Sequence, residues 1–449
     1  MKSLLLAMGL FLAFQLPLHG QATDSVHNWT RWRGPLGTGE APNATPPTVW
    51  SETENVKWKT AIPGRGHSTP IVWDNLIFLT TAVPFGEKQE PRYSDRPGAH
   101  DNLPVSQKHR FLVIAVNRED GSIVWETQVH ETLPREGAHY TASLTSASPV
   151  TDGKYVYVFL GSYGLYCLDF QGKLVWSKTL GSMHTKHGHG EGASPALQDD
   201  TLIVNWDHEE ASFIAAFDKK TGKEIWRQPR SEVTSWSSPI IVKHQDQYQV
   251  IVAGTQRVRA YDLKDGTLIW ECGGLSNNVV ATPVSAQGIV VVGSSYEKRA
   301  MFGIRLEQAR GDITDTDQVA WFTRERTPYV PSPLIYKDAV YYLRHYQNVL
   351  SRRELASGQE RSGPFRLQGL RDIYASPVAA NNRIYVTDRE GVTIVFQHVL
   401  DEVNEPPRLI AANPIGDTVN ASLALVGNQI LIRGEKFLYC IEDELSEDN

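Results

Sequence analysis

Residues 148–178, SPVTDGKYVYVFLGSYGLYCLDFQGKLVWSK, contain four short extended segments separated by three tight turns that carry glycine. Glycine supplies the positive φ that short hairpin turns need. The inner segments, 155–160 and 165–169, are apolar at almost every position, a pattern typical of strands whose sheet is covered on both faces. The stretch therefore predicts one four-stranded antiparallel sheet that needs a neighbour on each side.

The Ser/Thr-Pro step that opens this stretch recurs along the chain with a period of about 45 residues. The copies are Thr69-Pro70, Ser148-Pro149, Ser194-Pro195, Ser238-Pro239, Thr282-Pro283, Ser332-Pro333 and Ser376-Pro377, with a degenerate eighth at Ser422-Leu423. A four-stranded sheet repeated at this period is typical of a propeller blade. The sequence therefore predicts an all-β, eight-bladed β-propeller with four antiparallel strands per blade.

Tryptophan marks the fourth segment of most repeats, at Trp58, Trp125, Trp176, Trp226, Trp270 and Trp321. Blades move apart as radius grows, so a large apolar side chain is expected to fill the outer gap while its indole N–H reaches a carbonyl. Trp58 precedes the first Ser/Thr-Pro step. Residues 55–60 are therefore expected to close the eighth blade as its fourth strand, which removes exposed sheet edges.

The composition is that of a globular protein without the charge of a nucleic-acid binder. Lys and Arg number 44 against 51 Asp and Glu, which gives a net charge of −7. Residues 1–22 combine Lys2, an apolar run and small residues, the order of a secretory signal peptide cleaved near residue 22. Residues 23–449 are then expected to form a single exported propeller domain, periplasmic or secreted, monomeric and without a transmembrane segment.

Residues 217–226, FDKKTGKEIW, resemble the Asp-x-x-Thr-Gly-x-x-x-Trp signature of PQQ-like β-propeller repeats, and 261–270, YDLKDGTLIW, is a near copy. The segments WRGP at 32–35 and PGRGHSTP at 63–70 look like the start of exported PQQ-binding-like repeat proteins. The resemblance extends over roughly residues 29–442 and implies the same fold.

That superfamily includes the quinoprotein alcohol dehydrogenases and an outer-membrane-assembly lipoprotein that is a scaffold without quinone. The dehydrogenases usually carry a vicinal Cys-Cys disulfide beside the cofactor, whereas the three cysteines here, Cys167, Cys272 and Cys440, are far apart in sequence. Their calcium ligands and catalytic Asp match no positions in this chain, and the anchoring cysteine of the lipoprotein is also absent.

The absence of a Cys-Cys pair favours a non-enzymatic protein-interaction or ligand-binding scaffold of the cell envelope. Its partner would be another envelope or secreted protein or a small ligand. The alternative is an enzyme that depends on PQQ with calcium or on a metal, although no Cys-Cys pair supports PQQ.

Long connections mark one face of the predicted propeller. The insertion at 84–109 and the segments 130–145 and 181–192 all fall in loops that join the second to the third strand of a blade or one blade to the next. Such loops share one face, here called the decorated face, beside blades 1 to 3. Long loops on a rigid scaffold commonly carry function, so this face is expected to bind the partner or ligand.

The third of these loops is rich in histidine. His184, His187, His189 and Glu191, together with His208 in the same blade, offer imidazole and carboxylate ligands that suit a zinc-like metal. Their spacing matches no compact metal motif, so a solvated polar loop is the alternative.

A second candidate site lies at the mouth of the central channel. The residues three positions before each repeat proline, or its equivalent, should share one level there: His67, Ser146, Gly192, Trp236, Val280, Val330, Tyr374 and Asn420. Arg65, Asn278, Arg344 and Asp372 are expected to join His67, Trp236 and Tyr374 in binding a small ligand. A channel lined with ordered water is the alternative.

Overall fold

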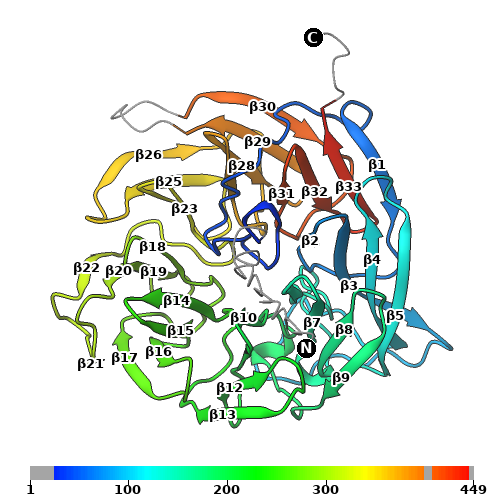
Figure 1. Cartoon of the computed structure of the whole chain (residues 1–449), viewed down its shortest axis with the longest axis horizontal. Helices are drawn as coiled ribbons and strands as arrows, with labels where there is room; N and C mark the ends of the chain where they lie inside the picture. The colour runs from blue at the N-terminus through cyan, green and yellow to red at the C-terminus, as the bar shows by residue number, and fades with distance from the viewer. Residues whose placement is uncertain (1–24, 399–406, 444–449) are drawn as a thin grey trace, which may run out of the picture.

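The computed structural model describes residues 25–398 and 407–443, so the predicted signal peptide lies outside the described residues. Eight sheets stand as blades around a central axis (Figure 1). Each blade has four antiparallel strands, which confirms the predicted eight-bladed β-propeller. The described helical segments are the short turns η1 (Ser25–His27), η2 (Gly161–Tyr163) and η3 (Lys186–Gly188). Within these ranges, no helix has the length and hydropathy needed to cross a membrane.

The strands follow one another from the axis outward within each blade. Blades 1 to 4 are β2 (Ile71–Trp73), β3 (Leu76–Phe85), β4 (Lys108–Asn117) and β5 (Ile123–Thr132); β6 (Val150–Thr151), β7 (Tyr155–Phe159), β8 (Leu165–Asp169) and β9 (Leu174–Lys178); β10 (Ala196–Gln198), β11 (Thr201–Trp206), β12 (Phe213–Asp218) and β13 (Glu224–Pro229); and β14 (Ile240–His244), β15 (Gln247–Ala253), β16 (Arg257–Asp262) and β17 (Leu268–Gly273).

Blades 5 to 8 repeat this order, except that blade 5 also contributes one short strand to the sheet of blade 4. They are β18 (Val284–Ala286), β19 (Ile289–Ser294), β20 (Ala300–Arg305) and β22 (Val319–Thr323); β23 (Leu334–Tyr336), β24 (Ala339–Leu343), β25 (Val349–Glu354) and β26 (Glu360–Arg366); β27 (Val378–Ala380), β28 (Arg383–Thr387), β29 (Val392–Gln397) and β30 (Leu409–Pro414); and β31 (Ala424–Val426), β32 (Gln429–Arg433) and β33 (Phe437–Glu442) with β1 (Val56–Ala61). The additional strand, β21 (Gly311–Asp312), extends blade 4.

The ring is closed as predicted. Strand β1 pairs antiparallel with β33, and Trp58 lies opposite Cys440 in this pairing. In Figure 1 the blue β1 accordingly runs along the red β33, so the two ends of the chain share blade 8. This shared blade leaves no open edge between the first and last repeats.

The Ser/Thr of each repeat step has a structural role beside the axis. The backbone N–H of Thr69 donates to the Ser148 hydroxyl of the next blade at 2.9 Å. The same contact continues blade by blade at Ser148, Ser194, Ser238, Thr282, Ser332 and Ser376, with distances of 2.8–3.0 Å, and ends at the Ser422 hydroxyl. These bonds satisfy buried amides and join neighbouring blades.

The outer tryptophans join the blades at larger radius. The indole N–H of Trp176 donates to the Lys219 carbonyl of blade 3 at 2.9 Å. Trp58, Trp125, Trp226 and Trp321 make the equivalent bond to the next blade at 2.8–2.9 Å. In the receiving turn, Gly222 has a φ of +67°, and a Cβ there would lie 2.7 Å from the Trp176 ring. The Gly of the repeat signature is therefore required by the tryptophan of the preceding blade.

Trp270 departs from this pattern. Its indole N–H donates to the side-chain oxygen of Gln249 in its own blade at 2.9 Å, and the residue is fully buried. The connection between the third and fourth strands of blade 5 is long here and contributes β21, which pairs with β17 at Trp270. Leu306, Ala309 and Ile313 of this connection pack in one cluster with Trp270, and the Gln249 side chain takes the place of the usual carbonyl of the next blade.

The hydrophobic core lies between adjacent blades. Phe78 and Phe111 of blade 1, for example, are fully buried in one cluster with Val156 and Leu168 of blade 2. Each sheet is covered on both faces by its neighbours, which accounts for the uninterrupted apolar runs of the inner strands.

Candidate functional site

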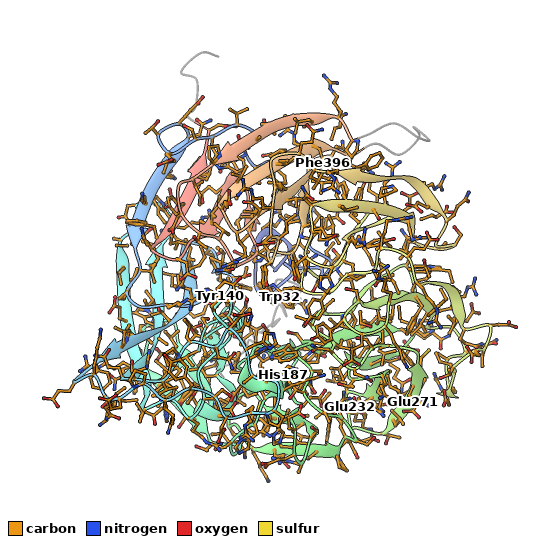
Figure 2. The ribbon with its side chains drawn as sticks, turned by 180° about the vertical axis from the view of Figure 1, so that it is seen from behind. Trp32, Tyr140, His187, Glu232, Glu271 and Phe396 are labelled. Carbon is orange, nitrogen blue, oxygen red and sulfur yellow. The ribbon has the colours of Figure 1, made fainter. Side chains whose placement is uncertain are left out.

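The central channel widens at the decorated face into a cavity of about 480 Å³. All eight residues three positions before a repeat proline or its equivalent line it, as expected from the symmetry of the ring. Figure 2, seen from behind Figure 1, labels Trp32, Tyr140 and His187 around the centre of the ring, and all three line the cavity. A volume of several hundred Å³ with mixed aromatic and polar walls is typical of ligand-binding pockets.

The floor of the cavity comes from the N-terminal segment, which crosses the centre of the ring in blue (Figure 1). Trp32 and Ser194 line both this cavity and a second one of about 230 Å³, so the two cavities are neighbours. Arg33 is buried and donates to the carbonyls of Pro333 and Pro377, each at 2.9 Å, and of Thr38 at 3.2 Å. Burial lowers the pKa of Arg33 to about 9. The sequence motif at 32–35 carries a family resemblance but does not predict that this segment crosses the channel.

One wall of the cavity is a continuous row of aromatic rings from blades 5 to 7. Tyr296 stacks on Tyr329 at a centroid distance of 5.5 Å, and Tyr329 stacks on His345 at 4.6 Å. The row continues to Tyr346 at 4.4 Å and from there to Tyr374 at 5.7 Å. Tyrosine offers a broad apolar face and a hydroxyl together, a combination enriched in binding surfaces.

The opposite wall consists of the three long loops, which occupy residues 86–107, 133–149 and 179–195 between their strands. Backbone hydrogen bonds hold these loops to one another. Leu103 donates to Ala138 at 2.9 Å, Tyr140 donates to Asp101 at 2.8 Å, and His139 donates to His189 at 3.2 Å. The insertion is therefore a packed part of the wall.

Four histidines meet in this wall: His100, His139, His187 and His189. His187 and His189 belong to the ligand set predicted from the sequence, whereas His100 and His139 come from the other two loops and are not in that set. Burial, followed by the charges of neighbouring histidines, lowers the pKa of His189 to about 4, so its imidazole is neutral at pH 7. Only the spatial packing of the loops brings the four together.

The other residues of the predicted metal set make separate contacts. His184 faces carboxylates, with Nδ1 at 3.3 Å from Glu136 and Nε2 at 3.5 Å from Glu210. His208 accepts a bond from the His184 backbone N–H at 3.2 Å. Glu191 accepts bonds from the N–H and hydroxyl of Ser162 at 2.6 and 2.5 Å, and burial raises its pKa to about 7. The five residues predicted from the composition of this loop and blade therefore do not form one group.

The channel-mouth set is largely brought together. His67, Trp236, Asn278, Asp372 and Tyr374 line the cavity, whereas Arg65 and Arg344 are not among its lining residues. The Trp236 indole donates to the Gly190 carbonyl at 2.7 Å, which links blade 4 to the histidine-rich loop. The amide nitrogen of Asn278 donates to the Tyr329 hydroxyl at 3.1 Å.

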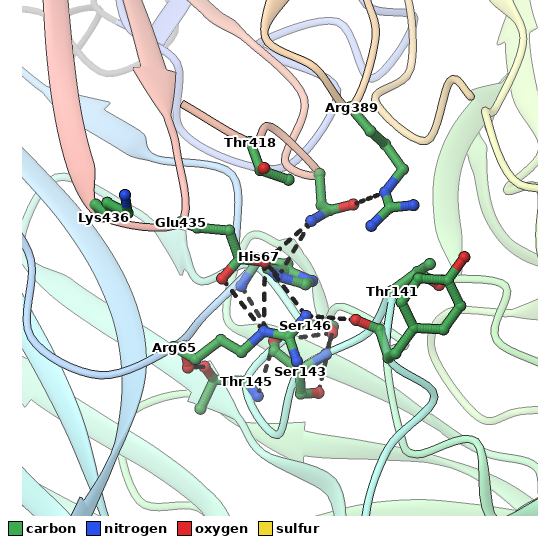
Figure 3. Close-up of polar contacts among 12 residues, drawn as sticks. Arg65, His67, Thr141, Ser143, Thr145, Ser146, Arg389, Thr418, Glu435 and Lys436 are labelled. Carbon is green, nitrogen blue, oxygen red and sulfur yellow. Dashed lines mark hydrogen bonds and ion pairs between the residues drawn. The ribbon is translucent and has the colours of Figure 1, made fainter. Parts of the chain in front are cut away.

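Glu435 organises the polar part of the mouth (Figure 3). Its carboxylate is 2.8 Å from His67 Nε2, 3.2 Å from Arg65 Nε and 3.1 Å from the amide nitrogen of Asn420. Arg389 donates to the side-chain oxygen of Asn420 at 2.9 Å. Burial opposes ionisation of Glu435, but the bond from His67 and the charge of Arg65 prevail and lower its pKa to about 2.

Replacing Glu435 by glutamine is expected to make the protein's stability depend differently on pH. The pKa of Glu435 falls from 4.5 in the unfolded chain to about 2 in the folded one, so its carboxylate stabilises the fold above pH 4.5 and loses this effect as the pH falls toward 2. Urea unfolding should show a loss of about 2 kcal/mol at pH 7 that shrinks at pH 3. An equal loss at both pH values would contradict this account, and Glu325→Gln on the exposed surface serves as the control.

The cysteines do not contribute to the cavity. Cys167 lies in β8, Cys272 in β17 and Cys440 in β33, all buried as free thiols, and none is among the lining residues. The cavity described here therefore lacks the disulfide that the resemblance associates with PQQ, and in this respect its residues do not fit that cofactor.

Comparisons with known proteins agree with the architecture. The family model described as "Outer membrane protein assembly factor BamB" matches residues 109–363, more than half of the chain. A BamB from Burkholderia pseudomallei is 25% identical over 260 residues, which cover 52% of this chain and 63% of that protein. A BamB from Yersinia pestis is 22% identical over 352 residues, which cover 67% and 84%. The match to a BamB of Moranella endobia covers 50% of that protein. The chain therefore spans less than two thirds of the length of the relatives from Burkholderia pseudomallei and Moranella endobia.

Solved structures show the same fold at low identity. BamB from Moraxella catarrhalis has a TM-score of 0.54 at 14% identity, with 81% of this chain and 99% of that one covered. Quinohemoprotein alcohol dehydrogenase from Comamonas testosteroni has a TM-score of 0.62 at 10% identity, with 96% and 85% covered. At these identities the similarity concerns the fold alone.

Proposed function

Because the chain belongs to the family of outer membrane protein assembly factor BamB, we propose that it is a non-enzymatic binding scaffold of the cell envelope. Its decorated face takes up a short extended segment of a protein partner. The proposal includes export of the chain to the periplasm or the cell exterior as a single propeller domain.

One observation carries this proposal: the cavity opens where the three long loops of blades 1 to 3 meet the aromatic wall of blades 5 to 7. Large apolar side chains also stand exposed on this face, at Tyr93, Leu103, Tyr140 and Tyr296 with exposed fractions of 40–69%. Tyrosine and other aromatic residues supply much of the binding energy in protein interfaces. The cavity accepts side chains of the segment, and the exposed residues contact its flanks.

A small ligand is the second candidate, because the cavity volume of about 480 Å³ falls within the range of small-molecule sites. The two candidates differ in what covers the exposed residues around the mouth. A small molecule fits inside the cavity and leaves Tyr93 and Leu103 of the insertion uncovered, whereas a protein partner buries them.

In-cell photocrosslinking tests this function. A photoreactive amino acid is introduced at Tyr93 and Tyr140 on the decorated face and, as the control, at Lys264 in a turn on the opposite face. We expect discrete protein adducts from the first two positions in cells that naturally produce the chain, and none from Lys264. Adducts from neither Tyr93 nor Tyr140 would contradict a protein partner here. Saturable binding of PQQ with calcium to the purified chain would instead favour the enzymatic alternative.

A further inference from the structure

Three imidazoles from three separate loops converge at the cavity wall. His100 lies in loop 86–107, His139 in loop 133–149 and His189 in loop 179–195. One nitrogen of each lies within 4.8 Å of the corresponding nitrogens of the other two. The ring of His189 is 4.7 Å from that of His100 and 4.8 Å from that of His139, measured between centroids.

The hydrogen bonds of the described residues engage Nδ1 of His100 and Nδ1 of His139 but not Nε2 of His189. His100 Nδ1 is 2.8 Å from the Gly98 carbonyl, so this nitrogen carries the proton and Nε2 holds the lone pair. His139 Nδ1 lies 2.7 Å from the Thr141 hydroxyl and accepts the Thr141 backbone N–H at 3.3 Å, so Nε2 becomes a metal ligand once the ring proton moves to Nδ1, which then donates to that hydroxyl. His189 Nε2 is buried and has no hydrogen-bond partner among the described residues. The Nδ1–H of His100 thus donates to a backbone carbonyl, as the second nitrogen of a metal-binding histidine characteristically does.

We propose that His100, His139 and His189 bind one divalent transition-metal ion, with Zn²⁺ as the best fit. Three neutral imidazoles without a carboxylate ligand suit Zn²⁺ better than Mg²⁺ or Ca²⁺, which prefer oxygen. Nitrogens bound tetrahedrally at about 2.1 Å from zinc lie about 3.4 Å apart. Small rotations of the rings bring the present spacing to that value.

The coordination leaves one position open. All three histidines line the cavity, so the fourth position of a tetrahedral ion faces the space that an occupant enters. Three protein ligands with an open position are typical of zinc sites that bind a further ligand. The fourth ligand is a water molecule or a donor group of the occupant, and the bound ion ties the insertion to the other two loops.

The site is tested on the purified full chain, freed of tag histidines and of metal, by calorimetric titration with Zn²⁺ alone. We expect one equivalent to bind with a Kd of about 1 μM or below. Addition of Co²⁺ should give the intense visible absorption of a tetrahedral site. His189→Ala and His139→Ala should each weaken binding about 100-fold. His345→Ala is the matched control, because this histidine lines the opposite wall of the same cavity.

His100→Ala provides a second test, which is needed if His139→Ala or His189→Ala disturbs the fold. His100 is exposed on the insertion, so its loss should leave the thermal melting of the metal-free protein unchanged while weakening Zn²⁺ binding. Absence of stoichiometric Zn²⁺ binding, or binding that His100→Ala leaves unchanged, would overturn the proposal. The result is independent of photocrosslinking, because metal binding is measured without any partner.

Discussion

Replacing Asp207 by alanine is expected to destabilise the protein by about 3 to 5 kcal/mol, because it leaves the guanidinium of Arg230 buried without its counter-charge. Both side chains are completely buried, and two N–H groups of Arg230 donate to the carboxylate at 2.7 and 3.0 Å. The Ser235 hydroxyl also donates to Asp207, at 2.6 Å, and Arg230 donates to the Tyr261 hydroxyl at 2.9 Å. Urea unfolding measures the loss.

This buried network fixes the connection between blades 3 and 4 that carries Trp236 to the cavity. Glu224→Ala removes a partner of Arg227 from an ion pair on the surface of the same blade and is the control. It should cost less than about 1 kcal/mol, since solvent screens such pairs. Equal effects of Asp207→Ala and Glu224→Ala would contradict the role assigned to the buried pair.

Replacing Arg33 by alanine is expected to destabilise the protein by about 3 kcal/mol and to loosen the floor of the cavity. The substitution removes three hydrogen bonds and leaves the carbonyls of Pro333 and Pro377 buried without this donor. Urea unfolding reports the stability, and limited proteolysis within residues 25–50 reports the floor. Leu36→Ala, at an exposed position of the same segment, is the control. Wild-type stability and proteolysis in Arg33→Ala would refute the role of Arg33.

The fold could be predicted because its determinants are local and repeated. Ser148-Pro149 and its copies mark the innermost strand, Gly222 marks the outer turn, and Trp176 marks the outer strand, each recurring with the blade period. Ring closure could be predicted because Trp58 precedes the first Ser/Thr-Pro step and so has no complete repeat before it. The same symmetry placed His67 and Tyr374 correctly in the cavity wall.

The remaining features depend on contacts that have no period. His100 and His139 join His189 only because the insertion packs against its neighbouring loops. No spacing in the sequence predicts this packing. Trp32 reaches the floor of the cavity because its segment crosses the ring before the first blade begins. Trp270 departs from the other tryptophans because β21 arrives from a loop of blade 5.

The most direct test of the central claim, that the decorated face binds a protein segment in the cavity, is photocrosslinking from inside the cavity. The photoreactive residue replaces Tyr346, which belongs to the aromatic wall. We predict the same protein adduct from Tyr346 as from Tyr140, and none from Lys264. An adduct that forms equally from Lys264, or a Tyr346 position that yields no protein adduct, would contradict the account.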